Sequence, residues 1–189
     1  AQLQAIETAN MAALTSDGLR ALRSLQVNAL RTDQIAALTT RQVANLSSVQ
    51  ISGLSTDQVV AIESSDIAAL STDNLRVLTS LQIRTLDSSQ IVALTTMQAS
   101  SLSTANASVL KDEQITALQT ADVAALSSSS LRALGSAQLQ ALTTDQVLAM
   151  VTAQFAAMST FNVSSLGTVQ VAALPRGSQV EIEVIAVSP

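Results

Sequence analysis

The sequence predicts an all-α repeat solenoid followed by a C-terminal β-strand tail. Three observations lead to this prediction. A large apolar residue returns every eight positions from Ile6 to Leu174, which defines twenty-one octads. The octads are rich in Ala, Gln and Leu, which favour helices. Every octad except the one with Asp112 also carries Ser or Thr near its start, where a helix N-cap is expected. We therefore expect each octad to form one short capped helix.

The octads share the consensus x-[ST]-x-Q-[VI]-x-A-L, in which the recurring apolar residue takes position 8. Position 8 is Leu except at Ile62, Met150 and Met158. Position 5 is a large apolar residue except at the neighbouring Ala99 and Ala107. Position 4 is Gln in thirteen of the twenty-one octads, a recurrence more typical of a structural role than of ligand binding.

The eight-residue period excludes a continuous helix, because eight residues at ~100° each rotate the apolar stripe by ~80° per octad. A flat strand also fits poorly, since positions 5 and 8 would face opposite sides of it. In a single helical turn the same two positions share one face. Where position 1 is Ser or Thr, as at Thr39 and Thr143, Gln follows with the spacing of a capping box. Which of the two hydroxyls caps the helix stays open at this point.

One such turn buries too little apolar surface to fold alone, so the octads must stack on one another. The small residue at position 7 permits close approach, and the recurrent Gln could join layers through an amide ladder. We expect positions 5, 7 and 8 to face inward and positions 1, 3 and 6 to face outward. Two and three octads per superhelical coil are both compatible with the sequence.

Two domains are expected. Residues 1–174 form the solenoid, with complete octads over 7–174, and residues 175–189 form a turn followed by a strand in which Val and Ile alternate with Glu. This strand would cap the last coil, lead into further chain, or add to a neighbouring subunit.

The two ends also supply the candidate self-association residues. The first six residues match positions 5 and 8 of a partial octad that lacks a polar cap, which indicates a terminus that is cut or suited to stacking. The candidate residues at the two ends are Leu3, Ile6, Val180, Ile182 and Val184.

The composition argues against an enzyme. The chain has no His, Cys, Trp or Tyr, which removes Ser-His-Asp and Cys-His nucleophile systems, imidazole and thiolate metal ligands, and disulfides. No pair of carboxylates recurs with the spacing of a calcium loop or a glycosidase. We therefore expect no catalytic residues, no cofactor and no metal site.

Charge and hydropathy argue against nucleic acid as a partner and against insertion into a membrane. A formal charge of −5 has the wrong sign for a phosphate-binding surface, and two Phe offer little for base stacking, so nucleic acid is not an expected partner. Polar residues interrupt every apolar stretch well before the ~18 to 20 residues of a membrane span, so no membrane insertion is expected.

Two segments carry a family resemblance: Leu30-Arg31-Thr32-Asp33-Gln34-Ile35-Ala36-Ala37-Leu38 and Leu94-Thr95-Thr96-Met97-Gln98. They resemble the Leu-Thr-Thr-x-Gln-Ile/Val-x-Ala-Leu tandem octapeptide repeats of large proteobacterial secreted or surface, adhesin-like proteins. The resemblance covers residues 7–174. It implies an extracellular or cell-surface location, and it carries over no functional residue.

The first hypothesis for function is a structural protein of a bacterial surface or extracellular assembly. Its expected partner is a second copy of the same chain. Copies that join head to tail form a fibre that does not close on itself. The alternative is a monomeric, adhesin-type spacer or binding scaffold that presents a lateral surface to a host or matrix ligand. The sequence does not identify that ligand.

Overall fold

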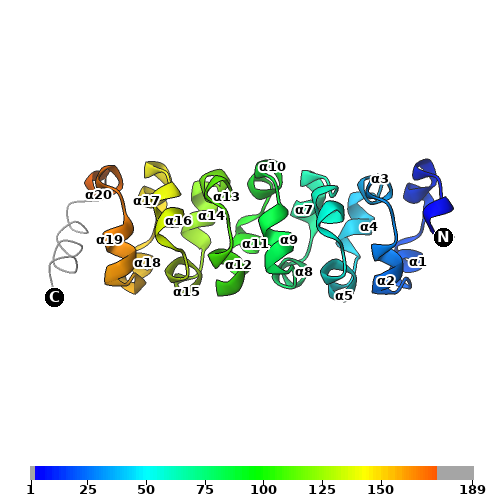
Figure 1. Ribbon diagram of the computed structural model, residues 1–189, viewed down its shortest axis with the longest axis horizontal. Helices are drawn as coiled ribbons and strands as arrows, with labels where there is room; N and C mark the ends of the chain where they lie inside the picture. The colour runs from blue at the N-terminus through cyan, green and yellow to red at the C-terminus, as the bar shows by residue number, and fades with distance from the viewer. Residues whose placement is uncertain (1–2, 174–189) are drawn as a thin grey trace. The chain divides into compact units, whose positions relative to one another are not determined.

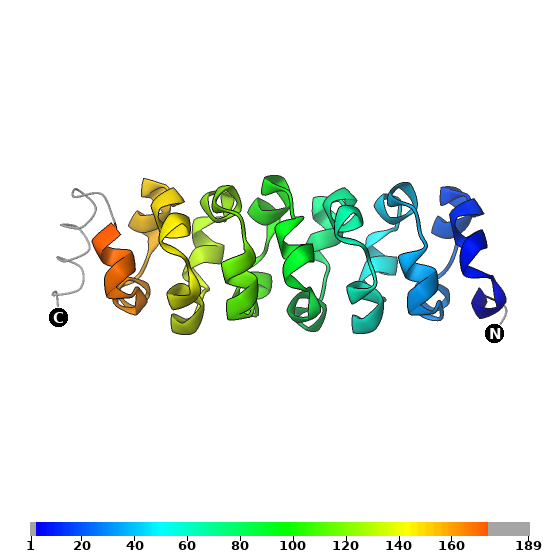
Figure 2. The same cartoon turned by 90° about the horizontal axis from the view of Figure 1, so that it is seen from above.

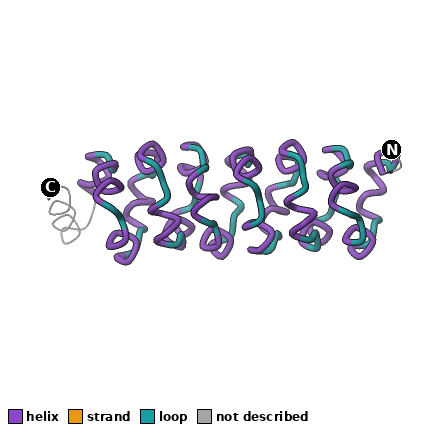
Figure 3. The backbone as a smooth tube through the Cα atoms, turned by 60° about the horizontal axis from the view of Figure 1, so that its bottom comes forward, coloured by secondary structure: helices purple, strands orange, loops and turns teal. Residues whose placement is uncertain are grey.

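The computed structural model describes residues 3–173, and this part of the chain is helical and contains no strand (Figure 3). The chain divides into two compact units, Ala1–Leu94 and Thr95–Pro189, with the boundary between two octads. The predicted all-α repeat solenoid is confirmed. The predicted strand, including Val180, Ile182 and Val184, lies outside the described residues.

The described part of the first unit begins with two 3-10 helices, and one short α-helix per octad follows in both units. In the first unit the helices are η1 (Leu3–Ala5), η2 (Thr8–Ala13), α1 (Ser16–Arg20), α2 (Ser24–Asn28), α3 (Thr32–Ala36), α4 (Thr40–Ala44), α5 (Ser48–Ser52), α6 (Thr56–Val60), α7 (Ser64–Ala69), α8 (Thr72–Arg76), α9 (Ser80–Thr85) and α10 (Ser88–Val92). In the second unit they are α11 (Thr96–Ser101), α12 (Thr104–Ser108), α13 (Asp112–Ala117), α14 (Thr120–Ala125), α15 (Ser128–Arg132), α16 (Ser136–Ala141), α17 (Thr144–Ala149), α18 (Thr152–Ala157), α19 (Thr160–Ser165) and α20 (Thr168–Ala173).

Each helix begins and ends within one octad. In α4 and its flanking residues, the N–H of Val43 donates to the carbonyl of Thr39 at 3.0 Å, and the N–H of Leu46 donates to the carbonyl of Val43 at 3.1 Å. Positions 8 and 1 are then extended, as in Leu70 (φ −62, ψ 140) and Ser71 (φ −65, ψ 156). No described residue has positive φ, so this break between helices requires no glycine.

Three octads make one coil in each unit. In the first unit α4 packs against α1 and α7, and α7 packs against α10 (Figure 1). In the second unit α14 packs against α11 and α17, and α17 packs against α20 (Figure 2). Neighbours in such a column start 24 residues apart, as α4 at Thr40 and α7 at Ser64 do. Of the two coil sizes compatible with the sequence, the structure has the larger.

Positions 5 and 8 form the core, as expected. Val43 and Leu46 are buried in the first unit, and Ala99 and Ala107, the two small residues at position 5, are buried in the second. Removing these side chains from water is the main favourable term for stacking.

Position 7, which was expected to face inward, is half-buried at most sites and is less enclosed than positions 5 and 8. Most position 7 residues are small, and at Gly53 an adjacent coil leaves no room for a side chain. At Gly53 an added Cβ would collide with the hydroxyl of Ser24. The carbonyl of Gly53 accepts a hydrogen bond from Asn28 Nδ2 at 2.7 Å. Positions 1, 3 and 6 are exposed or half-buried at most sites, in line with the expectation.

Candidate functional site

Where position 1 is Ser, Thr or Asp, its side chain caps the following helix, whereas Glu63 and Gln119 at the same position make no cap hydrogen bond. Thr39 Oγ1 accepts from the N–H of Gln42 at 3.3 Å, and in return Gln42 Oε1 accepts from the N–H of Thr39 at 2.7 Å. The capping box predicted at Thr39 and Thr143 is therefore confirmed. It also resolves which hydroxyl is the cap.

The same Gln side chain reaches across to another coil. Gln42 Nε2 donates to the carbonyls of Met11 at 2.8 Å and Leu14 at 2.7 Å, which are positions 5 and 8 four octads earlier. We call this arrangement the glutamine clamp: Oε1 accepts from the N–H of its own position 1, and Nε2 donates to those two earlier carbonyls. The clamped residues are Gln34, Gln42, Gln50, Gln58, Gln82, Gln90, Gln138, Gln146, Gln154 and Gln170.

The clamp replaces the amide ladder considered from the sequence. These amides bond to backbone groups and not to one another, because stacked coils bring the carbonyls at the helix breaks next to the amide. Each clamped Gln is buried, and both of its N–H groups and its oxygen are paired. A buried amide is tolerated only when paired in this way, so the clamp fixes which coil carbonyls each octad contacts.

Other donors at position 4 make part of the clamp. Asn74 Nδ2 donates to the position 8 carbonyl of Leu46 at 2.8 Å, and Ser130 Oγ donates to that of Leu102 at 2.7 Å. Asp66 and Asp122 occupy the same position and are also buried. A carboxyl group carries no amide N–H, so these two octads lack the amide donor of the clamp.

The first coil exposes all three of its position 4 residues, Asn10, Gly18 and Gln26. Gln26 is exposed: its Oε1 accepts from the N–H of Arg23 at 2.8 Å, and no described residue accepts from its Nε2. The position 8 residues Ile6, Leu14 and Leu22 are half-buried, whereas Leu30 is buried. We call Ile6, Leu14, Leu22 and Gln26 the N-terminal face.

The predicted self-association residues are placed in part. Leu3 and Ile6 are half-buried, and their carbonyls accept from Gln34 Nε2 at 2.9 Å and 2.8 Å. Their backbones thus belong to the first clamp, while Ile6 also contributes its side chain to the N-terminal face. The candidate residues of the tail lie outside the described part of the chain. The sequence did not single out Gln26 as exposed. Its octad has the same pattern as the other octads with Gln at position 4, and its exposure depends on the coil size.

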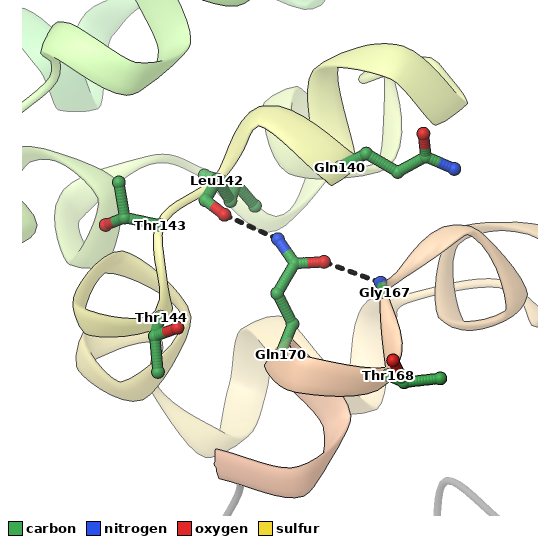
Figure 4. A pocket seen from close by; sticks show the side chains of 7 residues that line it. All are labelled: Gln140, Leu142, Thr143, Thr144, Gly167, Thr168 and Gln170. Atoms are coloured by element: carbon green, nitrogen blue, oxygen red, sulfur yellow. Dashed lines mark hydrogen bonds between the residues drawn. The ribbon is translucent and has the colours of Figure 1, made fainter.

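A surface pocket of about 460 Å³ lies in the second unit, where α17 and α20 are neighbours (Figure 4). It is lined by Gln140, Leu142, Thr143, Thr144, Gly167, Thr168 and Gln170. Figure 4 shows Gln170 between the Leu142 carbonyl and the Gly167 N–H, at 2.5 Å and 2.6 Å. Gly167 has no side chain at position 1, and an added Cβ would lie 3.3 Å from Gln170 Oε1. The lining carries no titratable side chain, so it suits a neutral polar group and provides no acid or base.

Charged side chains form short local contacts at the surface. Arg31 and Asp33 pair at 3.0 Å, and the Thr8 hydroxyl donates to Asp33 at 2.8 Å. The hydrogen bond from Arg31, followed by that from Thr8, lowers the pKa of Asp33 to about 2. Among residues 3–173 no group of three or more acidic side chains could hold a metal ion. No helix in this part of the chain is long and apolar enough to cross a membrane.

Comparison with known families locates the repeat. The ALTTAQ repeat profile matches residues 3–40, 35–61, 59–104 and 115–152. The chain belongs to the ALTTAQ repeat family. The six letters of ALTTAQ correspond to positions 7, 8, 1, 2, 3 and 4, as in the run Ala37-Leu38-Thr39-Thr40-Arg41-Gln42. Each six-residue run of this kind therefore covers one helix break, its capping residue and its clamp residue, and each profile match spans several such runs. A search of curated proteins finds no match to this ALTTAQ chain.

Proposed function

We propose that this ALTTAQ repeat chain is a structural protein of a bacterial surface or extracellular assembly, and that copies join end to end through the N-terminal face. The observation that carries the proposal is the exposed Gln26, whose Nε2 has no acceptor within the described chain. The surface location rests on the resemblance of the octads to repeats of secreted and surface proteins.

A coil from a second copy would complete the N-terminal face. Its position 5 and 8 carbonyls would accept from Gln26 Nε2, as those of Met11 and Leu14 accept from Gln42. The half-buried Ile6, Leu14 and Leu22 would lose their remaining contact with water, which favours association. The contact joins two different surfaces, so it repeats along a line and does not close.

The test is sedimentation and electron microscopy across a protein concentration series. We expect the unaltered chain to form particles whose length grows with concentration. Leu22→Asp and Gln26→Ala should each shift the population to monomers without changing the helical circular dichroism signal. Met97→Asp, at an exposed position 3, is the matched control and should assemble like the unaltered chain. Discrete monomers of the unaltered chain at every concentration would contradict self-assembly.

A second candidate function is a monomeric spacer or binding scaffold of the adhesin type. Two observations favour it: the uncharged pocket beside Gly167, and the exposed apolar side chains Leu25 and Val49 on the adjacent helices α2 and α5. This function predicts saturable binding of the monomer to a host, matrix or polysaccharide ligand. The check is a binding panel of glycans and matrix proteins, with Gly167→Gln as a variant that fills the pocket.

A further inference from the structure

Asp122 occupies the clamp position of α14 without the chemistry of a clamp. The residue is 1% exposed, and its Oδ2 has no hydrogen-bond partner. The rest of the carboxyl group accepts hydrogen bonds from the hydroxyl of Thr96 and the backbone N–H of Gln119. Burying an unpaired carboxylate oxygen lowers the free energy of unfolding, and the loss is largest when the carboxyl group is ionised.

The surroundings of Asp122 offer no compensating positive charge. α14 packs against α11 and α17, and α11 carries no titratable side chain. α17 carries one, Asp145, which is exposed and of the same sign. Neither packed helix therefore stabilises the ionised form.

Neighbouring octads show which groups this position accommodates. Ser130 donates its hydroxyl proton to the carbonyl of Leu102, and Gln138 and Gln146 donate amide protons in the same way. These position 4 side chains are neutral donors. The Asp122 carboxyl group is a neutral hydrogen-bond donor only in its protonated form.

We propose that Asp122 makes the coil around α14 responsive to pH, so that the coil is tightest when this carboxyl group is protonated and loosens when it ionises. Burial raises the pKa of Asp122, and the hydrogen bonds from Thr96 and Gln119 oppose this shift. Because the folded-state pKa is raised, the contribution to stability is fully present below the unfolded-state pKa. It is lost as the pH rises through the folded-state pKa.

The test compares Asp122→Asn with Asp145→Asn in the full chain, by thermal melting from about pH 4 to about pH 8. Asn keeps the acceptor oxygen for Thr96 and Gln119 and replaces the unpaired oxygen with a donor. We expect the Tm of Asp122→Asn to exceed that of the unaltered chain by on the order of a few degrees at the high end, with the difference shrinking towards the acidic end. Asp145→Asn should follow the pH profile of the unaltered chain.

A carboxyl carbon NMR titration of the unaltered chain is the second measurement, and it does not depend on the folding of any variant. The proposal requires the Asp122 resonance to titrate above the ordinary Asp value of about 3.9. A midpoint at or below that value, or a Tm difference between Asp122→Asn and the unaltered chain that stays constant with pH, would overturn it.

Discussion

At the scale of the residue, position within the octad decides what a substitution does. Leu94 at position 8 is 4% exposed and Met97 at position 3 is 72% exposed, although they stand close in sequence. Leu94→Asp places a charge in the core and should cost about 3–5 kcal/mol of unfolding free energy, whereas Met97→Asp should change it by no more than about 0.5 kcal/mol. Urea unfolding of the two variants checks this. Equal stabilities would refute the assignment of positions 5 and 8 to the core.

The sequence predicted contacts within one octad better than contacts between coils. The burial of Leu94 follows from the period and from i, i+3 geometry, and the capping box at Thr39 follows from spacing, although the choice between the two hydroxyls came only from the structure. The targets of Gln42 could not be derived, because carbonyls 28 and 31 residues earlier become neighbours only once coil size is fixed. The same dependence on coil size hid the exposed Gln26 and the unpaired oxygen of Asp122.

At the scale of the element, the donor half of the clamp is what joins one helix to an earlier coil. Gln146→Glu keeps the oxygen that accepts from Thr143 but loses the N–H bonds to Ile115 and Leu118, and it buries a charge against their carbonyls. We expect a loss of about 3–5 kcal/mol in unfolding free energy. The check is thermal and denaturant melting of the variant.

Gln26→Glu is the matched control, since Gln26 is exposed and its oxygen keeps the bond from Arg23. Its stability should stay within about 0.5 kcal/mol of the unaltered chain. If both Glu variants are equally stable, the amide N–H groups contribute nothing to coil stacking.

Within residues 3–173, the cap of α10 is the one place where a carboxylate, that of Asp87, replaces the usual hydroxyl cap. The Ser89 hydroxyl, followed by the backbone N–H of Gln90, lowers the pKa of Asp87. With a lowered folded-state pKa, its contribution is present above the unfolded-state pKa and lost as the pH falls through the folded-state pKa. Asp87→Ala should cost about 1 kcal/mol at neutral pH and less in acid. Asp87→Ser retains a cap without a charge, so its Tm should lack this acid-dependent loss.

At the scale of the whole chain, the octad is the unit that can be removed. Deleting residues 39–46 joins Leu38 to Ser47 and leaves every later octad in phase. Deleting residues 39–42 places the following apolar residues out of phase with the earlier ones. We expect the eight-residue deletion to keep a single cooperative helical melt and the four-residue deletion to lower or broaden it. Circular dichroism melting of both variants checks this, and an equal loss in both would mean that phase does not matter.

The coil size was the main feature of the fold that the sequence left open. Apart from Ala99 and Ala107, the octads carry large apolar residues at positions 5 and 8, so the core residues do not distinguish the three octads of a coil from one another. Position 3 has no clear period of its own either: Leu25 and Val49 share a column with Asp73. The number of short helices that enclose the core is set by packing in three dimensions, and it leaves no trace in an eight-residue repeat.

The two periods of this fold place different demands on the gene that encodes it. Unequal recombination that adds or removes any whole number of octads preserves the interior, because core and clamp recur every eight residues. The outer columns recur every 24 residues, so an insertion between Leu25 and Val49 keeps these two side chains in one column only when it adds a multiple of three octads. The number of octads can therefore change without disturbing the core or the clamp. The alignment of exposed side chains along a column is kept only when the change is a multiple of three octads.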